Sequence, residues 1–317
     1  MSTVARSRSA QHRILVMGAV YALIAAPAVV AAIEAAHYYV QNRTNGHVLS
    51  DGEERAFLLH VPNGYDGTRP VPLVISMHGG GAWPALQMHV SGWNRVADEY
   101  GFLVVYPAGH GKPMRWETFE PGADLGRDVR YIAALIDTLR AAFAIDSTRI
   151  YADGLSNGGG MAFVLSCTLA DRIAAIGMVA PAQTLPPAWC PDRRPLPMIS
   201  FHGDADPILP YSGGPMGGAG PVRPVFAPVR TFVAWWAERN RCATTPVETA
   251  IAADVVRLEY TECAEGAPVV FHTLLGGGHT WPSGHGLPEW FTGPTVRSID
   301  ATNEMWGFFR RYRLRAE

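Results

Sequence analysis

Short apolar runs alternate with amphipathic stretches along most of the chain, a pattern typical of strands followed by helices. It predicts strands over Arg55–Val61, Pro72–His78, Phe102–Ala108, Arg149–Asp153, Ala174–Ala180, Pro197–Gly203, Val255–Tyr260 and Pro268–Leu275. It predicts helices over Asp128–Phe143, Ala227–Asn240 and Ser298–Arg311. Because strands and helices alternate, we expect an α/β fold with a mostly parallel central sheet and helices on both faces.

The N-terminus departs from this pattern. Arg6, Arg8 and Arg13 precede Ile14–Ile33, a run without charged residues. A positive segment followed by an apolar one is typical of an export signal. The run predicts an N-terminal apolar helix that is either a cleaved signal peptide or an uncleaved anchor, since about 20 apolar residues can cross a bilayer. In an anchored protein, the arginines would keep the N-terminus inside and place the rest of the chain outside.

Composition favours one folded domain after this segment. Of the 317 residues, 48% are hydrophobic and 17% are charged, enough for a sizeable core. The net charge of −2 offers no support for nucleic-acid binding, which needs a basic patch. We therefore divide the chain into a signal peptide or signal anchor (1–36), a connector (37–50) and a catalytic domain (51–315). Contact with a membrane is expected only through the N-terminal segment, if it stays uncleaved.

The four cysteines fit an exported protein, whether secreted, periplasmic or held at the cell surface. Cys167 and Cys190 are close in sequence, and so are Cys242 and Cys263. In an oxidising compartment, two short-range disulfides are the natural interpretation, with buried free thiols as the alternative. No two cysteines form a C-x-x-C pair, so a zinc site or a thioredoxin-like site has little support.

The stretch Gly154-Leu155-Ser156-Asn157-Gly158 has the G-x-S-x-G pattern. It follows one expected strand and opens an expected helix, the context of a nucleophile elbow. A helix beginning there would point backbone N–H groups at developing negative charge. We predict that Ser156 is a nucleophile, and the alternative is a serine in a structural turn. The stretch lacks the lysine and the glycine spacing of phosphate-binding loops.

A serine nucleophile needs a base and an orienting acid. His279 lies in a glycine-rich loop just past the strand 268–275 and is the expected base, with His285 as the second candidate. Asp204 and Asp206 directly follow the strand 197–203, and either can be the acid. The order Ser, Asp, His along the chain is that of an α/β-hydrolase.

His202, Asp204 and Asp206 could also form a metal cluster by ligand type. The acid role already accounts for the carboxylates, and a turn-stabilising role accounts for the histidine. We therefore predict no metal. His78 as the base is a further alternative, although shaping the neighbouring glycine loop is its expected role.

An oxyanion hole needs two backbone donors. The N–H of Asn157, the residue after the nucleophile, is one expected donor. The glycine loop after His78 supplies the other, and Gly80 is the first choice and Gly81 the second. Three tryptophans near these motifs are expected to form an aromatic wall for substrate, or else to serve in packing: Trp83, Trp116 and Trp281.

The chain resembles the family of exported α/β-hydrolases that includes polyhydroxybutyrate depolymerase-like, feruloyl and acetylxylan esterases. The resemblance covers roughly Gly52 to Arg311 and lies in "HVPNGYDGTRPVPLVISMHGGG", "GLSNGGGMAF", "FHGDADPILPY" and "GGGHTWP". It implies the α/β-hydrolase fold, Asp206 rather than Asp204 as the acid and His279 as the base. It also favours the disulfides Cys167–Cys190 and Cys242–Cys263. The chain departs from the family pattern at Gly160, a third glycine where a methionine is more usual.

The expected function is serine carboxylic-ester hydrolysis through an acyl-enzyme, without a cofactor. Expected substrates are small or polymeric esters of feruloyl, acetyl, other short-acyl or hydroxyalkanoate type. A serine peptidase or an acyltransferase would use the same triad. A membrane-tethered binding module without turnover is the alternative of another class, and the intact triad argues against it.

Overall fold

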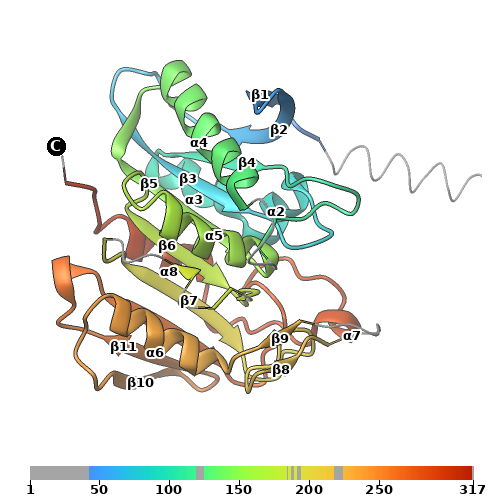
Figure 1. The fold of residues 1–317 in the computed structure, drawn as a ribbon, viewed down its shortest axis with the longest axis vertical. Helices are drawn as coiled ribbons and strands as arrows, with labels where there is room; N and C mark the ends of the chain where they lie inside the picture. The colour runs from blue at the N-terminus through green and yellow to red at the C-terminus, as the bar shows by residue number, and fades with distance from the viewer. Residues whose placement is uncertain are drawn as a thin grey trace, which may run out of the picture. The chain divides into compact units, whose positions relative to one another are not determined.

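The computed structural model of the protein describes residues 43–118, 125–183, 185–186, 189–190, 194–217 and 224–315. The chain divides into two units, 1–43 and 44–317, and all the elements below belong to the second (Figure 1). The predicted N-terminal helix falls outside the described residues. Within the described ranges, no helix is both long enough and apolar enough to span a membrane.

One large sheet of ten strands organises the second unit. Its strands lie in the order β1 (Gly46–Ser50), β2 (Glu53–His60), β4 (Leu103–Pro107), β3 (Val71–Met77), β5 (Ile145–Leu155), β6 (Ala175–Val179), β7 (Met198–Gly203), β12 (Val269–Leu274), β11 (Val255–Tyr260) and β10 (Val247–Ala252). The central strands from β4 to β12 are parallel, and the two outer strands at each edge are antiparallel. Strands β4, β6 and β7 are buried along their whole length, as apolar strands covered on both faces must be. The predicted mostly parallel sheet is confirmed.

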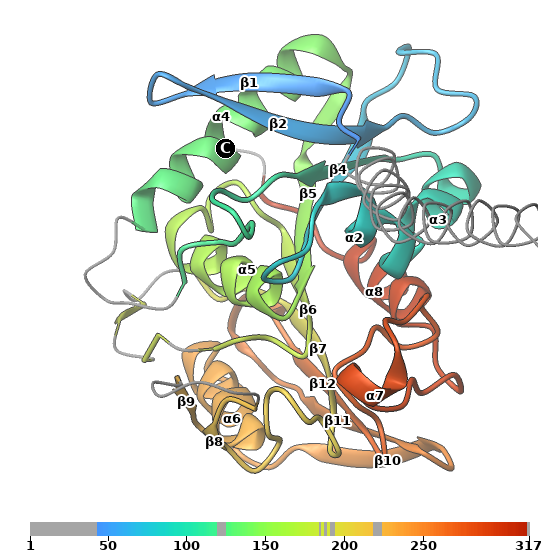
Figure 2. The same cartoon turned by 90° about the vertical axis from the view of Figure 1, so that its right-hand side faces the viewer.

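Helices cover both faces of this sheet (Figure 2). One layer contains α2 (Pro84–Ser91), α3 (Trp93–Tyr100) and α8 (Ala301–Phe309), and the other contains α4 (Leu125–Ala142), α5 (Asn157–Thr168) and α6 (Val229–Arg239). In the first layer, Trp93 stacks on Phe309 with ring centroids 6.1 Å apart. In the second, Phe163 packs edge-on against Phe232 and Trp236. Each helix layer therefore buries an apolar face against the sheet, as the alternating pattern predicts.

Several short elements lie outside the predicted pattern. These elements follow β7 in the sequence: a small ribbon of β8 (Gly214–Pro215) and β9 (Val225–Phe226), a 3₁₀ turn η2 (Ala264–Gly266) and the helix α7 (Glu289–Thr292). The edge strand β10 was not expected, because most of its residues are exposed and no apolar alternation marks it. The helices α2 and α3 are also additional, and each ends at a glycine with positive φ, Gly92 and Gly101.

The sheet begins inside the predicted connector. Residues 37–42 of that connector lie outside the described residues, but Gly46–Ser50 form β1, which pairs with β2. The two strands join through Asp51 and Gly52, both with positive φ. An Asp-Gly pair is a strong signal for a two-residue hairpin. The β1 strand was missed because only Val48 and Ser50 of it are buried.

Both expected disulfides are present, Cys167–Cys190 and Cys242–Cys263. They join residues 23 and 21 positions apart. Closing loops of this length stabilises a fold by roughly 3 kcal/mol each in the chain-entropy account. The two bridges fit a protein that folds in an oxidising compartment.

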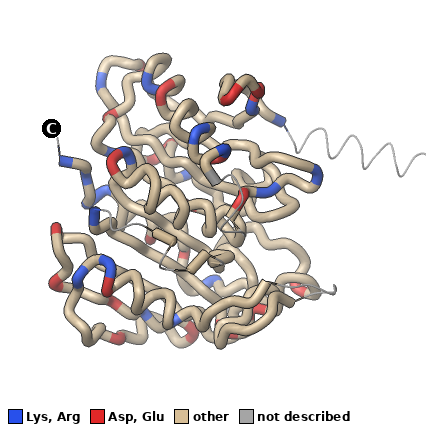
Figure 3. Tube along the Cα trace, in the orientation of Figure 1, with Lys and Arg blue, Asp and Glu red and all other residues tan. Residues whose placement is uncertain are grey.

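Charged residues of both signs are interspersed along the trace (Figure 3). Arg230 and Glu248, for example, form an ion pair in which about half of each side chain is exposed. Such pairs contribute only about 0–1 kcal/mol each. One pair differs, because Arg55 and Asp128 meet at 2.9 Å with both side chains buried.

His272 illustrates how burial in the sheet affects a titratable group. Its ring stacks on Phe201 with centroids 4.5 Å apart, so the side chain packs within the sheet layer. Burial lowers the pKa of His272 from 6.5 to about 4, and the charge of Arg257 acts in the same direction. The native state therefore holds a neutral ring over a pH range in which the unfolded chain binds a proton.

We predict that His272→Phe reduces the acid sensitivity of the fold. Between about pH 4 and pH 6.5 the unfolded chain binds more protons than the native chain, so native stability falls as the pH falls. Removing His272 should lower this slope by up to ~1.4 kcal/mol per pH unit. Urea unfolding at half-unit pH steps measures it, with His47→Gln at an exposed position as the control. An unchanged slope would contradict the prediction.

Candidate active site

The predicted nucleophile lies on a sharp turn between β5 and α5. Ser156 has φ 56° and ψ −117°, a conformation that residues other than glycine rarely adopt. The turn is held by its backbone: Ser156 N donates to Val179 O, and Ser156 O accepts from the N–H groups of Gly160 and Ala182, all at 2.9 Å. This strand–turn–helix geometry is that of a nucleophile elbow.

The glycines on either side of Ser156 allow the elbow to form. A Cβ atom on Gly154 would lie 2.3 Å from the carbonyl carbon of Gly158. A Cβ atom on Gly158 would lie 2.2 Å from Met77 O. Because backbone atoms are on both sides of these contacts, no rotamer change can relieve them. The start of α5 is therefore packed directly against the ends of β3 and β5.

Asp206 and His279 come into contact although they are 73 residues apart. His279 Nδ1 lies 2.8 Å from Asp206 Oδ2, and both residues are buried. The other carboxylate oxygen, Oδ1, accepts from the N–H groups of Ile208 and Leu209 at 2.8 Å each. Since a carboxylate only accepts, this hydrogen bond requires a proton on His279 Nδ1. Its Nε2 is then the basic atom.

The carboxyl group of Asp206 is kept ionised by its neighbours. Burial alone would raise the pKa of Asp206, but the side chains of His202 and His279 outweigh it and hold the pKa well below its usual range. His202 Nε2 lies 2.9 Å from Leu209 O and 3.4 Å from Asp206 Oδ2. His202 thus braces the turn that carries the acid. Across the described residues, no group of three or more ligating side chains is placed to hold a metal ion.

The other two candidates for acid and base have different contacts. Asp204 is exposed, and its Oδ1 accepts from Gly276 N at 2.6 Å. It therefore binds the backbone of the loop that leads to His279 rather than the imidazole. His285 stacks on the ring of His89 with centroids 4.5 Å apart. The contacts thus favour Asp206 and His279 over Asp204 and His285.

The two expected oxyanion segments lie side by side. Asn157 is the first residue of α5, so its N–H has no acceptor within the helix. A Cβ atom on Gly80 would lie only 3.6 Å from the Cβ of Asn157. The N–H of Gly81, the second choice, already donates to Met114 O at 2.7 Å. The geometry therefore favours Gly80 and argues against Gly81, whose donor is used within the loop.

His78 supports this loop. Its Nε2 accepts from Gly109 N at 2.9 Å, so Nδ1 carries the proton and donates to Gly79 O at 2.8 Å. Burial lowers the pKa of His78 to about 4, so the ring is neutral at neutral pH. With both ring nitrogens bound to backbone, His78 shapes the glycine loop as expected and has no atom left to act as a base.

A cavity of about 430 Å³ opens over the elbow. Both Ser156 and His279 line it, together with Gly80 and Asn157. The rest of its wall is largely apolar and includes residues that sequence analysis did not single out: Met114, Ile208, Met216, Leu287 and Phe291. The last two follow the GGGHTWP motif closely in sequence, which is the only signal that could have identified them.

Of the three tryptophans predicted to contact substrate, only Trp281 lines this cavity. Its indole N–H donates to Thr302 Oγ1 at 2.9 Å, which fixes the ring in the wall. Trp116 is fully buried and donates from its indole to His78 O at 2.9 Å. Trp83 precedes α2 and packs against the core. Neither Trp116 nor Trp83 lines the cavity, and for both the structure shows packing.

A second buried carboxyl group, Asp153, lies on β5, three residues before Ser156. Asp153 is fully buried and accepts from Ser76 Oγ at 2.7 Å. Burial raises the pKa of Asp153 to about 8, and the Ser76 hydrogen bond only partly opposes this. At neutral pH the group is largely uncharged. The strand beneath the elbow therefore adds little negative charge that would oppose an oxyanion.

Comparison with known proteins agrees with this architecture. A sequence profile of the family described as "Esterase PHB depolymerase" matches residues 55–183. The solved acetyl xylan esterase from Aspergillus awamori has a similar fold, with a TM-score of 0.56 and 15% identity over 76% of this chain and 93% of that one. The fold is therefore that of the α/β-type esterases.

Two curated proteins extend the likeness beyond the profile. The protein named "Putative esterase NocK" of Nocardia uniformis subsp. tsuyamanensis is 32% identical over 76% of this chain and 74% of its own length. "Feruloyl esterase B" of Piromyces equi is 28% identical over 74% of this chain, which spans 44% of that protein. The chain belongs to the esterase PHB depolymerase family. The prediction of a carboxylic-ester hydrolase is confirmed at the level of this family.

The third glycine of the elbow, Gly160, also has a steric cause. A Cβ atom there would lie 2.5 Å from Ala182 O. We predict that Gly160→Ala lowers both stability and activity. The start of α5 and the segment that contains Ala182 cannot move apart without shifting the elbow, because Ala182 N donates to Ser156 O. Gly307, inside α8, has open space around its Cβ position and is the matched control. Gly307→Ala should stabilise the fold by about 0.5–1 kcal/mol through helix propensity. Thermal melting and esterase assays measure both effects, and equal stability changes would refute the steric explanation.

Proposed function

We propose that the protein hydrolyses carboxylic esters, with Ser156 as nucleophile, His279 as general base and Asp206 as the acid that orients it. The observation that carries the proposal is the His279–Asp206 contact of 2.8 Å, with His279 and the strained Ser156 lining the same cavity. Membership of an esterase family supports the same chemistry. Any one of these features alone would be weaker support.

The geometry supports a two-step mechanism. His279 Nε2 takes the proton from Ser156 Oγ as that oxygen attacks the ester carbonyl. The N–H groups of Asn157 and Gly80 then stabilise the oxyanion, where loss of one donor typically costs about 10²–10³-fold in rate. The protonated His279 gives its proton to the departing alcohol, which leaves an acyl-enzyme. A water molecule repeats the sequence and releases the acid.

The cavity indicates the kind of ester. Apart from the catalytic groups, its wall is largely apolar, and Leu287 and Phe291 lie among its lining residues. An apolar wall favours aromatic or short aliphatic acyl groups over charged ones. Relatives with feruloyl and acetyl xylan esterase names support the same choice. Turnover of p-nitrophenyl acetate, methyl ferulate and hydroxybutyrate oligomers would rank these classes directly.

The proposal includes export across a membrane. The two disulfides support it, as does the apolar run Ile14–Ile33 behind its arginines. We propose that this run directs export, either as a cleaved signal peptide or as an anchor. N-terminal sequencing of protein recovered outside the cytoplasm distinguishes the two forms.

The direct test of the nucleophile is covalent labelling. A fluorophosphonate should form one adduct on Ser156 of the folded protein, detected by mass spectrometry of the peptide that contains it. Ser156→Ala should abolish both the adduct and ester turnover while leaving the melting temperature nearly unchanged. A folded wild-type protein that takes up no label would rule out the catalytic role and favour a binding module without turnover.

We predict that substitution of Asp206 and of Asp204 by asparagine will lower activity to very different extents. Asp206→Asn should lower kcat by about 10³–10⁴-fold, because an amide N–H facing His279 Nδ1 favours the wrong imidazole tautomer. Asp204→Asn keeps an oxygen that can accept from Gly276 N, so most activity should remain. The pair is matched in chemistry and lies in one loop. Similar losses in both variants would show that the assignment of the acid is wrong.

A further inference from the structure

The segment from Gly109 to Thr118, called here the 109–118 hairpin, lies beside both oxyanion donors. Its two arms are joined by reciprocal backbone hydrogen bonds between His110 and Arg115, at 3.0 and 2.9 Å. None of its residues belongs to the proposed triad. Its contacts nevertheless reach each half of the oxyanion hole.

Three hydrogen bonds connect the hairpin to the glycine loop that contains Gly80. Gly81 N donates to Met114 O at 2.7 Å, just past the proposed donor. On the other side of Gly80, His78 O accepts from the Trp116 indole and His78 Nε2 accepts from Gly109 N, both at 2.9 Å. His78 and Gly81, which lie on either side of Gly80 in the sequence, are thus both bound to the hairpin.

Three more hydrogen bonds connect the hairpin to Asn157, the other donor. The side-chain oxygen of Asn157 accepts from Trp116 N at 2.7 Å. Its Nδ2 donates to Trp116 O at 3.1 Å and to Thr118 Oγ1 at 2.7 Å. The Asn157 amide is buried and pairs with the backbone of Trp116 as a neighbouring strand would. The hairpin is therefore a bridge between the two N–H groups.

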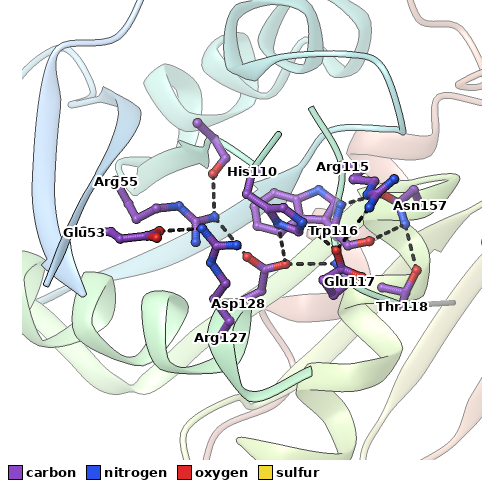
Figure 4. Close-up of polar contacts among 12 residues, drawn as sticks. Glu53, Arg55, His110, Arg115, Trp116, Glu117, Thr118, Arg127, Asp128 and Asn157 are labelled. Atoms are coloured by element: carbon purple, nitrogen blue, oxygen red, sulfur yellow. Dashed lines mark hydrogen bonds and ion pairs between the residues drawn. The ribbon is translucent and has the colours of Figure 1, made fainter. Parts of the chain in front are cut away.

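The hairpin is itself held from below by Asp128 of α4 (Figure 4). Asp128 Oδ2 accepts from Glu117 N at 3.0 Å and lies 3.3 Å from His110 Nδ1. Its Oδ1 accepts from Arg55 at 2.9 Å, and the carboxylate is fully buried. The other ring nitrogen of His110, Nε2, lies 2.6 Å from Glu117 Oε1.

The cation that meets Asp128 is equally constrained. Arg55, on β2, also donates to Ala108 O at 3.1 Å, immediately before the hairpin. Its guanidinium lies over the ring of Tyr131, 4.1 Å from the centroid. Removing one member of a buried ion pair leaves the other uncompensated, so the cluster is sensitive to a single neutral substitution.

We propose that Asp128 is a positioning residue for ester hydrolysis: by holding the 109–118 hairpin, it sets the spacing of the Asn157 and Gly80 N–H groups around the oxyanion. The inference rests on the proposed function. It predicts an effect on the transition state rather than on substrate binding, because neither Asp128 nor any of its direct partners, Arg55, His110 and Glu117, lines the cavity.

The test compares Asp128→Asn with Asp137→Asn, a substitution of the same kind on the same helix. Asp137 pairs with Arg172 at the surface and is the matched control. An asparagine at 128 turns an N–H toward one of the two donors, the Arg55 guanidinium or Glu117 N, so the hairpin should shift. We expect kcat for p-nitrophenyl acetate to fall about 10²-fold with KM little changed, as for small displacements of catalytic groups. Affinity for a trifluoromethyl ketone, whose serine adduct carries an oxyanion, should fall in parallel. Asp137→Asn should change none of these values.

The outcomes separate the inference from the proposed function. Wild-type protein without fluorophosphonate labelling or turnover would refute the proposed function. Active wild type combined with a folded Asp128→Asn variant that keeps kcat and ketone affinity would overturn the inference alone, and so would a change confined to KM. If Asp128→Asn does not fold, Thr118→Val is the second test of the contact between the hairpin and Asn157. It removes one bond to Asn157 and should lower kcat and ketone affinity together, and unchanged values overturn the inference.

Discussion

The close approach of the α5 N-terminus to the ends of β3 and β5 is the constraint on which the rest of this structure depends. Positions 154 and 158 have no room for a side chain, and Ser156 between them adopts a positive φ. Such strain persists only where surrounding structure over-determines it. Here the parallel strands β5 and β6 and the 180–182 segment bind the turn on both sides. The serine is exposed to the cavity as a consequence of backbone packing.

Buried carboxyl groups around this turn differ in charge because their neighbours differ. Asp206 receives two backbone N–H groups and two histidines, and its pKa is lowered despite burial. Asp153 has one serine partner, and burial raises its pKa to about 8. The number of hydrogen-bond donors, rather than the depth of burial, therefore decides which carboxyl group stays ionised. The ionised Asp206 therefore places a negative charge beside His279, whereas the largely uncharged Asp153 places little charge beneath Ser156.

Much of the fold and the site could be predicted from the sequence because the relevant signals are local. Apolar runs identified the central strands, and the G-x-S-x-G pattern between a strand and a helix identified the elbow. The disulfides followed from a resemblance to a family. The two edge strands that the sequence did not predict also have a local cause. Strands β1 and β10 lie at the sheet edges, where few residues are buried and the apolar pattern disappears.

Residue types and their order along the chain by themselves determined the α/β class, the position of the elbow at Ser156 and the short list of its candidate partners. Strand period and glycine requirements are properties of neighbouring residues, so these signals are local. Only the tertiary structure showed the contacts that distinguish choices which residue types and spacing alone leave open. Asp206 rather than Asp204 faces His279, and Gly80 rather than Gly81 has a donor to offer. The same holds for Trp116, which packs beneath the site instead of lining it, and for Asp128, a residue with no motif. Each of these outcomes depends on contacts between segments far apart in sequence, and hydrogen-bond partners at such distances are set by packing.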